Sequence, residues 1–187
     1  MKKHLKTLVL LIALTAFVTA THAQQNFLGE QPQFASRWVF GGDFGLGFSN
    51  YGSNILISPQ AGYRITPAWE FGARLTYNYY SYNQNRLKFS TNNYGGGFYT
   101  SYEIFRGLFA HAENEILSYE QVFYNPSNFD ITGRERKIIH SIFVGGGYRQ
   151  YFSSRGFASI MILYNLNETL DTPYTNPLFR IGFGFGL

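Results

Sequence analysis

The chain has 187 residues, a formal net charge of +4, 19% aromatic residues, 14% charged residues and no cysteine. This length accommodates one domain, or one domain plus a processed segment, and the lack of cysteine excludes disulfides, thiol nucleophiles and thiolate metal sites. The charged fraction is lower than that of an ordinary water-soluble surface.

Residues 1–23 are predicted to be a secretory signal peptide. A basic start and an apolar stretch over 8–20 precede the cleavage-site sequence Thr21-His22-Ala23. When the three lysines of this segment are removed, 12 of the 15 basic residues remain against 11 acidic ones, a net charge of +1. Neither this charge nor export favours a nucleic-acid partner. Residues 24–36 have no period and are interpreted as a flexible periplasmic lead-in to a folded domain over 37–187.

From residue 37 onward, large apolar side chains recur at every second position in stretches of about ten residues, the period of a β-strand with two unlike faces. In the last stretch, for example, Ile181 and Phe183 alternate with glycines. The eight predicted strands cover 37–49, 54–65, 69–81, 93–104, 108–118, 138–152, 157–166 and 177–187. Pro59 lies in the second strand and cannot donate to the ladder, so a bulge or a missing hydrogen bond is expected there.

The connections after the second, fourth and sixth strands are short, and those over 82–91, 119–136 and 167–176 are longer. Outer-membrane barrels show this asymmetry, with short periplasmic turns and longer surface loops. The loop over 119–136 carries four aromatic residues together with Arg134, Arg136 and Lys137. It is a candidate for binding a surface partner, and the alternative is a loop lying against lipid headgroups.

The number of apolar side chains decides which face points outward. A secreted, lipocalin-like barrel alternates as well, with its apolar side inward. The strands carry roughly 34 large apolar side chains, whereas the packed layers of an eight-stranded barrel hold only about a dozen. The apolar face should therefore contact outer-membrane lipid. The predicted fold is an all-β, eight-stranded, antiparallel, up-and-down transmembrane β-barrel, which leaves no free edge in lipid.

Two sets of residues follow from this orientation. Aromatic belts at the headgroups are predicted from Trp38, Trp69, Tyr77, Tyr79, Tyr94, Tyr102, Tyr148, Phe152 and Tyr164. A lumen charge network is predicted from Asp43, Arg64, Glu70, Arg74, Glu103, His111, Glu113, Glu115, Arg149 and Arg180. Because unpaired charges in a narrow lumen are costly, these acids and bases are expected to pair, and Arg64 should face Glu70 across one turn.

Three short motifs resemble porin-like outer-membrane β-barrel domains, the small eight-stranded barrels of the OmpX and OmpA type. They are Ile57-Ser58-Pro59-Gln60-Ala61-Gly62-Tyr63, the run from Gly146 to Phe152, and the closing run from Arg180 to Phe185. The resemblance covers essentially the whole mature chain. It implies insertion by the outer-membrane barrel assembly machinery, which reads the last strand, here through Phe183, Phe185 and Leu187. The family usually ends on an aromatic residue, whereas this chain ends on Leu187.

The sequence supports three hypotheses of function, none of which needs a metal or a cofactor. The first is a structural or surface-interaction role through the extracellular loops. The second is a narrow, porin-like channel for ions or small solutes, and a lumen plugged by its charges is favoured over such a pore. The third is a lipid-modifying enzyme, which is disfavoured because the adjacent pair His140-Ser141 points to opposite faces of a strand. We therefore expect no enzymatic activity.

Overall fold

The computed structural model describes residues 36–49, 52–84, 87–125, 129–168, 172–174 and 176–187. The predicted signal peptide over 1–23 and the lead-in up to residue 35 lie outside these residues. Within the described ranges, no helix is long and apolar enough to cross a membrane.

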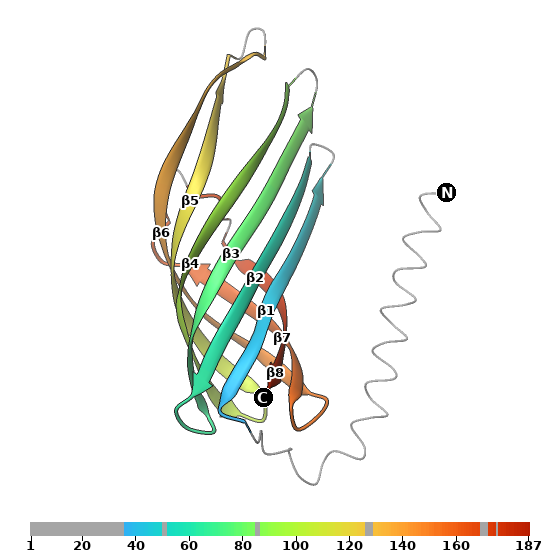
Figure 1. Cartoon of the computed structure of the whole chain (residues 1–187), viewed down its shortest axis with the longest axis vertical. Helices are drawn as coiled ribbons and strands as arrows, with labels where there is room; N and C mark the ends of the chain where they lie inside the picture. Colours follow the sequence, from blue (N-terminus) through green and yellow to red (C-terminus); the bar gives the residue numbers. More distant parts are fainter. Residues whose placement is uncertain (1–35, 50–51, 85–86, 126–128, 169–171, 175) are drawn as a thin grey trace, which may run out of the picture. The chain divides into compact units, whose positions relative to one another are not determined.

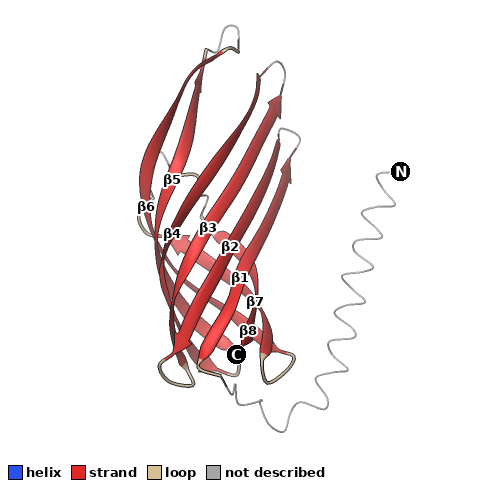
Figure 2. Cartoon of the chain, in the orientation of Figure 1, coloured by secondary structure: helices blue, strands red, loops and turns tan. Residues whose placement is uncertain are grey.

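Eight antiparallel strands form a closed barrel in which each strand pairs with its neighbours in sequence and β1 pairs with β8 (Figures 1 and 2). This confirms the predicted fold class. The strands are β1 (Trp38–Ser49), β2 (Gly52–Arg64), β3 (Trp69–Gln84), β4 (Leu87–Phe105), β5 (Leu108–Tyr124), β6 (Ile131–Tyr151), β7 (Gly156–Asn165) and β8 (Leu178–Gly186).

Two of the predicted surface loops are mostly strand, which corrects the sequence interpretation. Residues 82–84 and 87–91 continue β3 and β4, and residues 119–124 and 131–136 of the predicted binding loop continue β5 and β6. The cross-strand register runs through them, for example from Glu120 to Arg136. Their apolar side chains, such as Leu87, Phe123 and Ile131, fall out of phase with the lipid-facing positions, so the apolar period does not continue into them. The backbone ladder extends these hairpins, together with side-chain contacts such as the stacked rings of Tyr82 and Phe89.

The proline in β2 has the expected effect on one side of its strand. The ladder between β2 and β3 pairs Ile57 with Tyr77 and resumes at Gln60 with Arg74, so that Ser58 and Pro59 form no pair there. The register is the same before and after the gap. The prediction of a missing ladder contact is thus confirmed, and the strand accommodates proline without a bulge in this ladder.

The last two strands are the shortest, with 10 and 9 residues. As a result, β7 pairs with β6 only from Phe143 to Tyr151, and β8 pairs with β1 only from Val39 to Phe44. Figure 1 shows β1 to β6 continuing past β7 and β8 at the end opposite the C-terminus. We call this the hairpin end, and we call the end with the turns 65–68, 106–107 and 152–155 the turn end.

The barrel interior also holds apolar side chains that the sequence interpretation did not place there. A buried cluster contains Phe109, Leu117, Phe143, Met161, Leu163 and Tyr174. The strands β5, β6 and β7 supply five of these residues, because both faces of these strands carry apolar positions along part of their length. The lumen therefore combines a charged region with an apolar one.

Candidate functional site

The lumen is the candidate site, because the charged residues predicted to face inward gather there. Nine of the ten predicted residues are buried, and Glu103 is partly buried. The buried ones are Asp43, Arg64, Glu70, Arg74, His111, Glu113, Glu115, Arg149 and Arg180. Together with Glu103 of β4, they come from seven of the eight strands, all except β7.

One group of ion pairs forms around Glu70 near the turn end. Its carboxylate accepts a hydrogen bond from Arg149 at 3.0 Å and another from the Tyr99 hydroxyl at 2.8 Å. Arg64 lies opposite Glu70 in the ladder, with 3.9 Å between Nε and Oε2. The expected pairing across the turn is therefore present, and both oxygens of this buried carboxylate have hydrogen-bond donors.

Aromatic rings cover the guanidinium group of Arg149. Its central carbon lies 4.8 Å from the ring centroids of both Phe109 and Phe157. Nearby, the Tyr151 hydroxyl donates to Glu103 at 2.6 Å. The cation is thus held by a carboxylate on one side and by π-faces on others, an arrangement that suits the planar and weakly hydrated guanidinium group.

A second group is centred on Glu113 in β5. Its carboxylate accepts hydrogen bonds from Arg180 at 2.7 and 2.8 Å and from Arg74 at 2.6 Å. Arg74 also donates to Asp43 of β1. The group therefore links strands that are far apart around the barrel wall, and it ties their relative positions through charge-assisted hydrogen bonds.

The carboxylate of Glu115 has neutral partners in a third group. Thr76 donates to one of its oxygens and Tyr174 donates to the other, both at 2.5 Å. Tyr174 comes from the segment between β7 and β8 and packs edge-on against Phe143, with 5.2 Å between centroids. This contact inserts a loop residue into the barrel. Sequence reasoning missed it, because a tyrosine in a non-periodic segment carries no signal of direction.

Glycines in the wall make room for the larger lumen side chains. A Cβ atom placed on Gly184 would lie 2.3 Å from the ring of Phe157, and one on Gly72 would lie 2.6 Å from the ring of Tyr99. Neither aromatic residue fits beside a larger wall residue without a shift. In β8, the inward Gly184 thus faces the ring of Phe157, and the inward Gly182 faces the side chains of Asp43 and Ser159.

Ser101, His111 and Glu113 form a continuous hydrogen-bonded chain that sequence reasoning did not identify. The Ser101 hydroxyl lies 2.7 Å from His111 Nδ1, and His111 Nε2 lies 3.1 Å from Glu113. The sequence places Ser101 ten residues from His111 with no motif between them, and only the register of β4 on β5 pairs them directly. All three side chains are buried. In the described part of the chain, no group of three or more acidic or histidine side chains is arranged to hold a metal.

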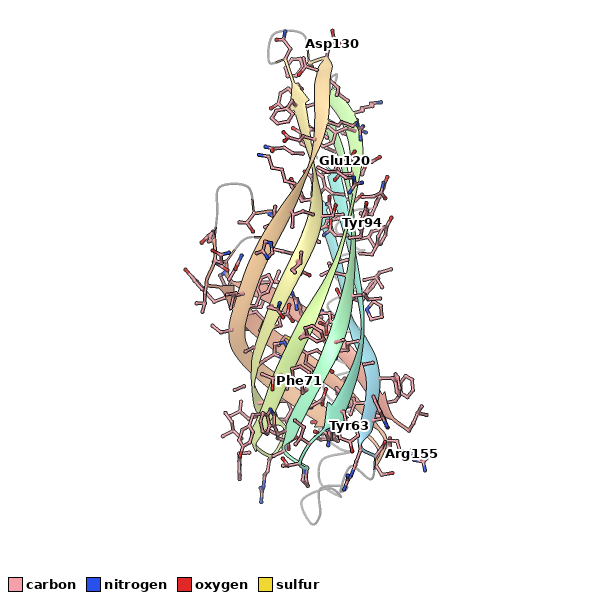
Figure 3. All side chains as sticks on the ribbon, turned by 60° about the vertical axis from the view of Figure 1, so that its left-hand side comes forward. Tyr63, Phe71, Tyr94, Glu120, Asp130 and Arg155 are labelled. Carbon is pink, nitrogen blue, oxygen red and sulfur yellow. The ribbon has the colours of Figure 1, made fainter. Side chains whose placement is uncertain are left out.

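The predicted belt residues lie on the outer surface, and all but Tyr79, which is half-buried, are exposed. Trp69 pairs directly with Tyr102, and eight residues further along the same two strands Tyr77 pairs with Tyr94. Eight residues of a tilted strand span about 20 Å along the barrel axis. Figure 3 shows side chains projecting outward along the wall, with Phe71 between Tyr63 and Tyr94.

The surface between these levels is apolar. Leu75, Phe98, Ile116 and Ile160 are each 45% to 66% exposed. The predicted insertion signal is exposed as well, at Phe183 and Phe185 of β8 and at Leu187, which follows that strand. A continuous apolar surface of this kind is unfavourable in water and matches the hydrocarbon region of a bilayer. The chain is therefore an integral membrane barrel.

Comparisons with known proteins find similarity to solved structures at low identity. No protein-family model and no curated protein matches the chain. Among solved structures, it is similar to the N-terminal β-barrel domain of Pseudomonas aeruginosa OprF, with 18% identity and a TM-score of 0.43 over 81% of this chain and 98% of that one. It is also similar to a de novo designed transmembrane β-barrel, with 14% identity and a TM-score of 0.41 over 84% and 98%. A third similarity is to the β domain of the Bordetella autotransporter BrkA, with 14% identity and a TM-score of 0.38 over 77% and 63%.

Proposed function

We propose that this chain is an outer-membrane protein that binds a partner at the cell surface through its hairpin end. The signal peptide over 1–23 directs export, and the assembly machinery reads Phe183, Phe185 and Leu187 in the last strand. The turn end then faces the periplasm and the hairpin end faces outward, because short turns are typical of the periplasmic side and the long hairpin extensions lie at the other end.

The observation that carries the surface role is the extension of the sheet beyond β7 and β8. β5 pairs with one edge of β6 along its whole length, but among the described residues no strand pairs with the opposite edge before Phe143. Leu166 and Asn167 donate to the carbonyls of Ile142 and His140, which covers the lower part of this edge. The upper part of this edge belongs to the β5–β6 hairpin. Figure 3 shows Glu120 and Asp130 of that hairpin at the end of the barrel far from Arg155.

An exposed sheet edge recruits an extended peptide as an additional strand. Here the edge carries charges, including Arg134, Glu135 and Arg136. Arg134 and Arg136 lie 3.3 and 4.0 Å from the carboxylate of Glu120 across the hairpin. Charges on an edge disfavour indiscriminate pairing, so the partner segment needs complementary charge.

The test compares adhesion of cells that display the whole chain with adhesion of cells in which residues 123–133 of the chain are replaced by Asn-Gly. We expect this shortened β5–β6 hairpin to lose adhesion to immobilised surface proteins, while the matched variant with Gln84–Leu87 replaced by Asn-Gly retains it. Equal adhesion by both variants and the whole chain would contradict the proposal. Surface labelling of each variant with an antibody controls for export.

The alternative function, a narrow channel, is disfavoured by the filling of the lumen. Glu70, Glu113 and Glu115 each have donors at hydrogen-bond distance, and the aromatic cluster lies beside them. We propose that the resting barrel is closed to ions. Planar-bilayer recording of the purified chain should show no conductance steps, and regular steps would establish the channel instead.

We also propose that the barrel is not an enzyme, although Ser101, His111 and Glu113 follow the order of a hydrolase triad. The serine is buried, and the carboxylate already accepts hydrogen bonds from Arg74 and Arg180. His111→Ala and His140→Ala should each leave hydrolysis of a fluorogenic phospholipid at the background of empty vesicles. Hydrolysis by the whole chain that either substitution abolishes would overturn this proposal.

A further inference from the structure

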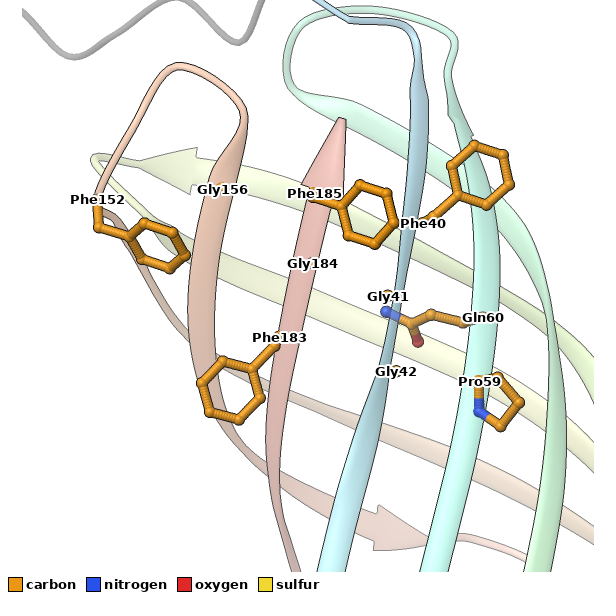
Figure 4. A pocket seen from close by; sticks show the side chains of 10 residues that line it. All are labelled: Phe40, Gly41, Gly42, Pro59, Gln60, Phe152, Gly156, Phe183, Gly184 and Phe185. Carbon is orange, nitrogen blue, oxygen red and sulfur yellow. The ribbon is translucent and has the colours of Figure 1, made fainter. Parts of the chain in front are cut away.

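The membrane-facing surface contains a hollow where β1 meets β2 and β8, with a volume of about 610 Å³. Its floor is at Gly42, which pairs with Pro59 of β2 and with Phe183 of β8. Figure 4 shows the rings of Phe40 and Phe185 close together at one side of this hollow, with 6.2 Å between their centroids. We call this feature the seam groove.

The backbone fixes the seam groove. A Cβ atom on Gly42 would lie 2.6 Å from the carbonyl oxygen of Ser58, so no larger residue fits there without a shift of β1 or β2. The compact ring of Pro59 lies opposite, at the interrupted part of the β2–β3 ladder. The groove is therefore part of the wall and does not depend on the rotamer of a single side chain.

The position of the seam groove places it among acyl chains. Gly42 is four residues from Trp38 along β1, or about 10 Å along the axis from the aromatic belt at the turn end. The lining is almost entirely apolar, and Gln60 is its one amide-bearing side chain. A chain lying in the groove gains van der Waals contacts with the phenylalanine rings that it does not have with neighbouring lipids.

Positive charge lies at the turn end beside the groove. Arg155 immediately precedes Gly156, which lines the groove, and its carbonyl accepts a hydrogen bond from Gly186 at 2.7 Å, next to Phe185. Arg155 is exposed, as is Arg37 at the start of β1. Guanidinium groups bind phosphate oxygens through paired N–H donors.

We propose that the seam groove binds one phospholipid, with an acyl chain over Gly42 and the headgroup phosphate at Arg155. This proposal rests on the membrane insertion proposed above and adds a specific lipid site to it. The anionic headgroup and the apolar chain match the two parts of the site, which lie in the order that a lipid of the periplasmic leaflet requires.

The test is native mass spectrometry of the mature chain, refolded in detergent and titrated with dioleoyl phosphatidylglycerol. We expect one lipid to remain bound after the others are stripped by collisional activation. Phe183→Ala should reduce the retained fraction at least fivefold because it removes a wall of the groove, and Arg155→Gln should do so because it removes the phosphate donor.

Each variant has a matched control. Phe179→Ala removes an outward ring from the same strand outside the groove, and Arg106→Gln removes an exposed arginine from another turn; both should retain the lipid. No retained lipid in the whole chain, or equal loss in variants and controls, would overturn the seam groove as a lipid site. Flotation of the same chain with vesicles separates this result from a failure of membrane insertion.

Discussion

At the scale of single residues, Glu113 illustrates how the lumen is stabilised. Its carboxylate accepts hydrogen bonds from two arginines and a histidine, and all four side chains are buried. Burying an ion pair yields little net stability, but removing one partner leaves a buried charge without compensation. The effect of substitution should therefore be large even if the contribution of the pairs to folding is small.

Glu113→Gln should lower the free energy of unfolding by roughly 3–5 kcal/mol, because Arg74 and Arg180 then lose their shared carboxylate. The measurement is a urea titration in phospholipid vesicles. Glu120→Gln is the control, since Glu120 pairs with Arg134 at the exposed hairpin and should change stability by less than about 1 kcal/mol. Equal effects of the two substitutions would contradict the assigned role of Glu113.

Gly184→Ala tests whether the wall glycines make room for the lumen. The added methyl would contact the ring of Phe157, so we expect a loss of about 1–3 kcal/mol. Gly133→Ala is the control, because a Cβ there meets nothing within 4 Å. The double substitution Gly184→Ala with Phe157→Leu should recover part of the loss. If it recovers none, the glycine has another role.

At the scale of elements, the parts of the strands inside the membrane could be predicted and the parts outside could not. The lipid-facing halves require alternation, as with Leu75 and Tyr77 in β3. The extension of β5 and β6 past Ser118 has water on both faces, so its residues follow no period. Tyr174 was also unpredictable, because its place in the lumen depends on the path of a connection.

The hairpin extensions should be dispensable for folding. When residues 123–133 are replaced by Asn-Gly, Val122 and Arg134 flank the turn, and the strands within the apolar band keep all their ladder partners. We expect the same gel shift between unheated and boiled samples as for the whole chain, and a change in unfolding free energy near zero. Loss of the shift would show that the barrel needs this hairpin to close.

The segment between β7 and β8 should act as a seal. Tyr174→Ala removes both the hydrogen bond to Glu115 and the ring against Phe143, and it leaves a cavity at the hairpin end of the lumen. In planar bilayers we expect small conductance steps that are absent from the unsubstituted chain. Tyr164→Ala, which removes an outward tyrosine from β7, should show none. Silent recordings from both variants would place the seal deeper, at Glu113.

At the scale of the whole molecule, the number of apolar side chains shows which face of the wall points outward. It does not show which charged residues pair in the lumen. The sequence indicates which residues face inward, such as Arg74 and Glu113, because alternation fixes the face. It does not indicate which acid meets which base, since Arg74 reaches both Asp43 and Glu113 across the barrel. That choice depends on closure, tilt and the positions of the glycines.

Closure itself can be tested with a cross-link, because the chain has no native cysteine. Phe44 and Ile181 are direct partners across β1 and β8. Cysteines at these two positions should form a disulfide and raise the free energy of unfolding, by about 5 kcal/mol in a chain-entropy estimate, which a urea titration measures. Cysteines at Phe71 and Thr100, partners within the β3–β4 hairpin, close a much shorter loop and should stabilise less. A larger effect from the second pair would contradict this reasoning.

The six residue pairs that join β1 to β8 have a consequence for biogenesis. These strands stand at opposite ends of the folded domain, so they meet only once the intervening six are in place. Until then, a nascent copy has two unpaired strand edges, and the membrane offers no water to hydrogen-bond their backbone groups. A second nascent copy presents the same two edges, so a high concentration of unfinished chains favours pairing between β1 of one copy and β8 of another. Efficient biogenesis therefore requires that each copy be shielded until its own ends have joined.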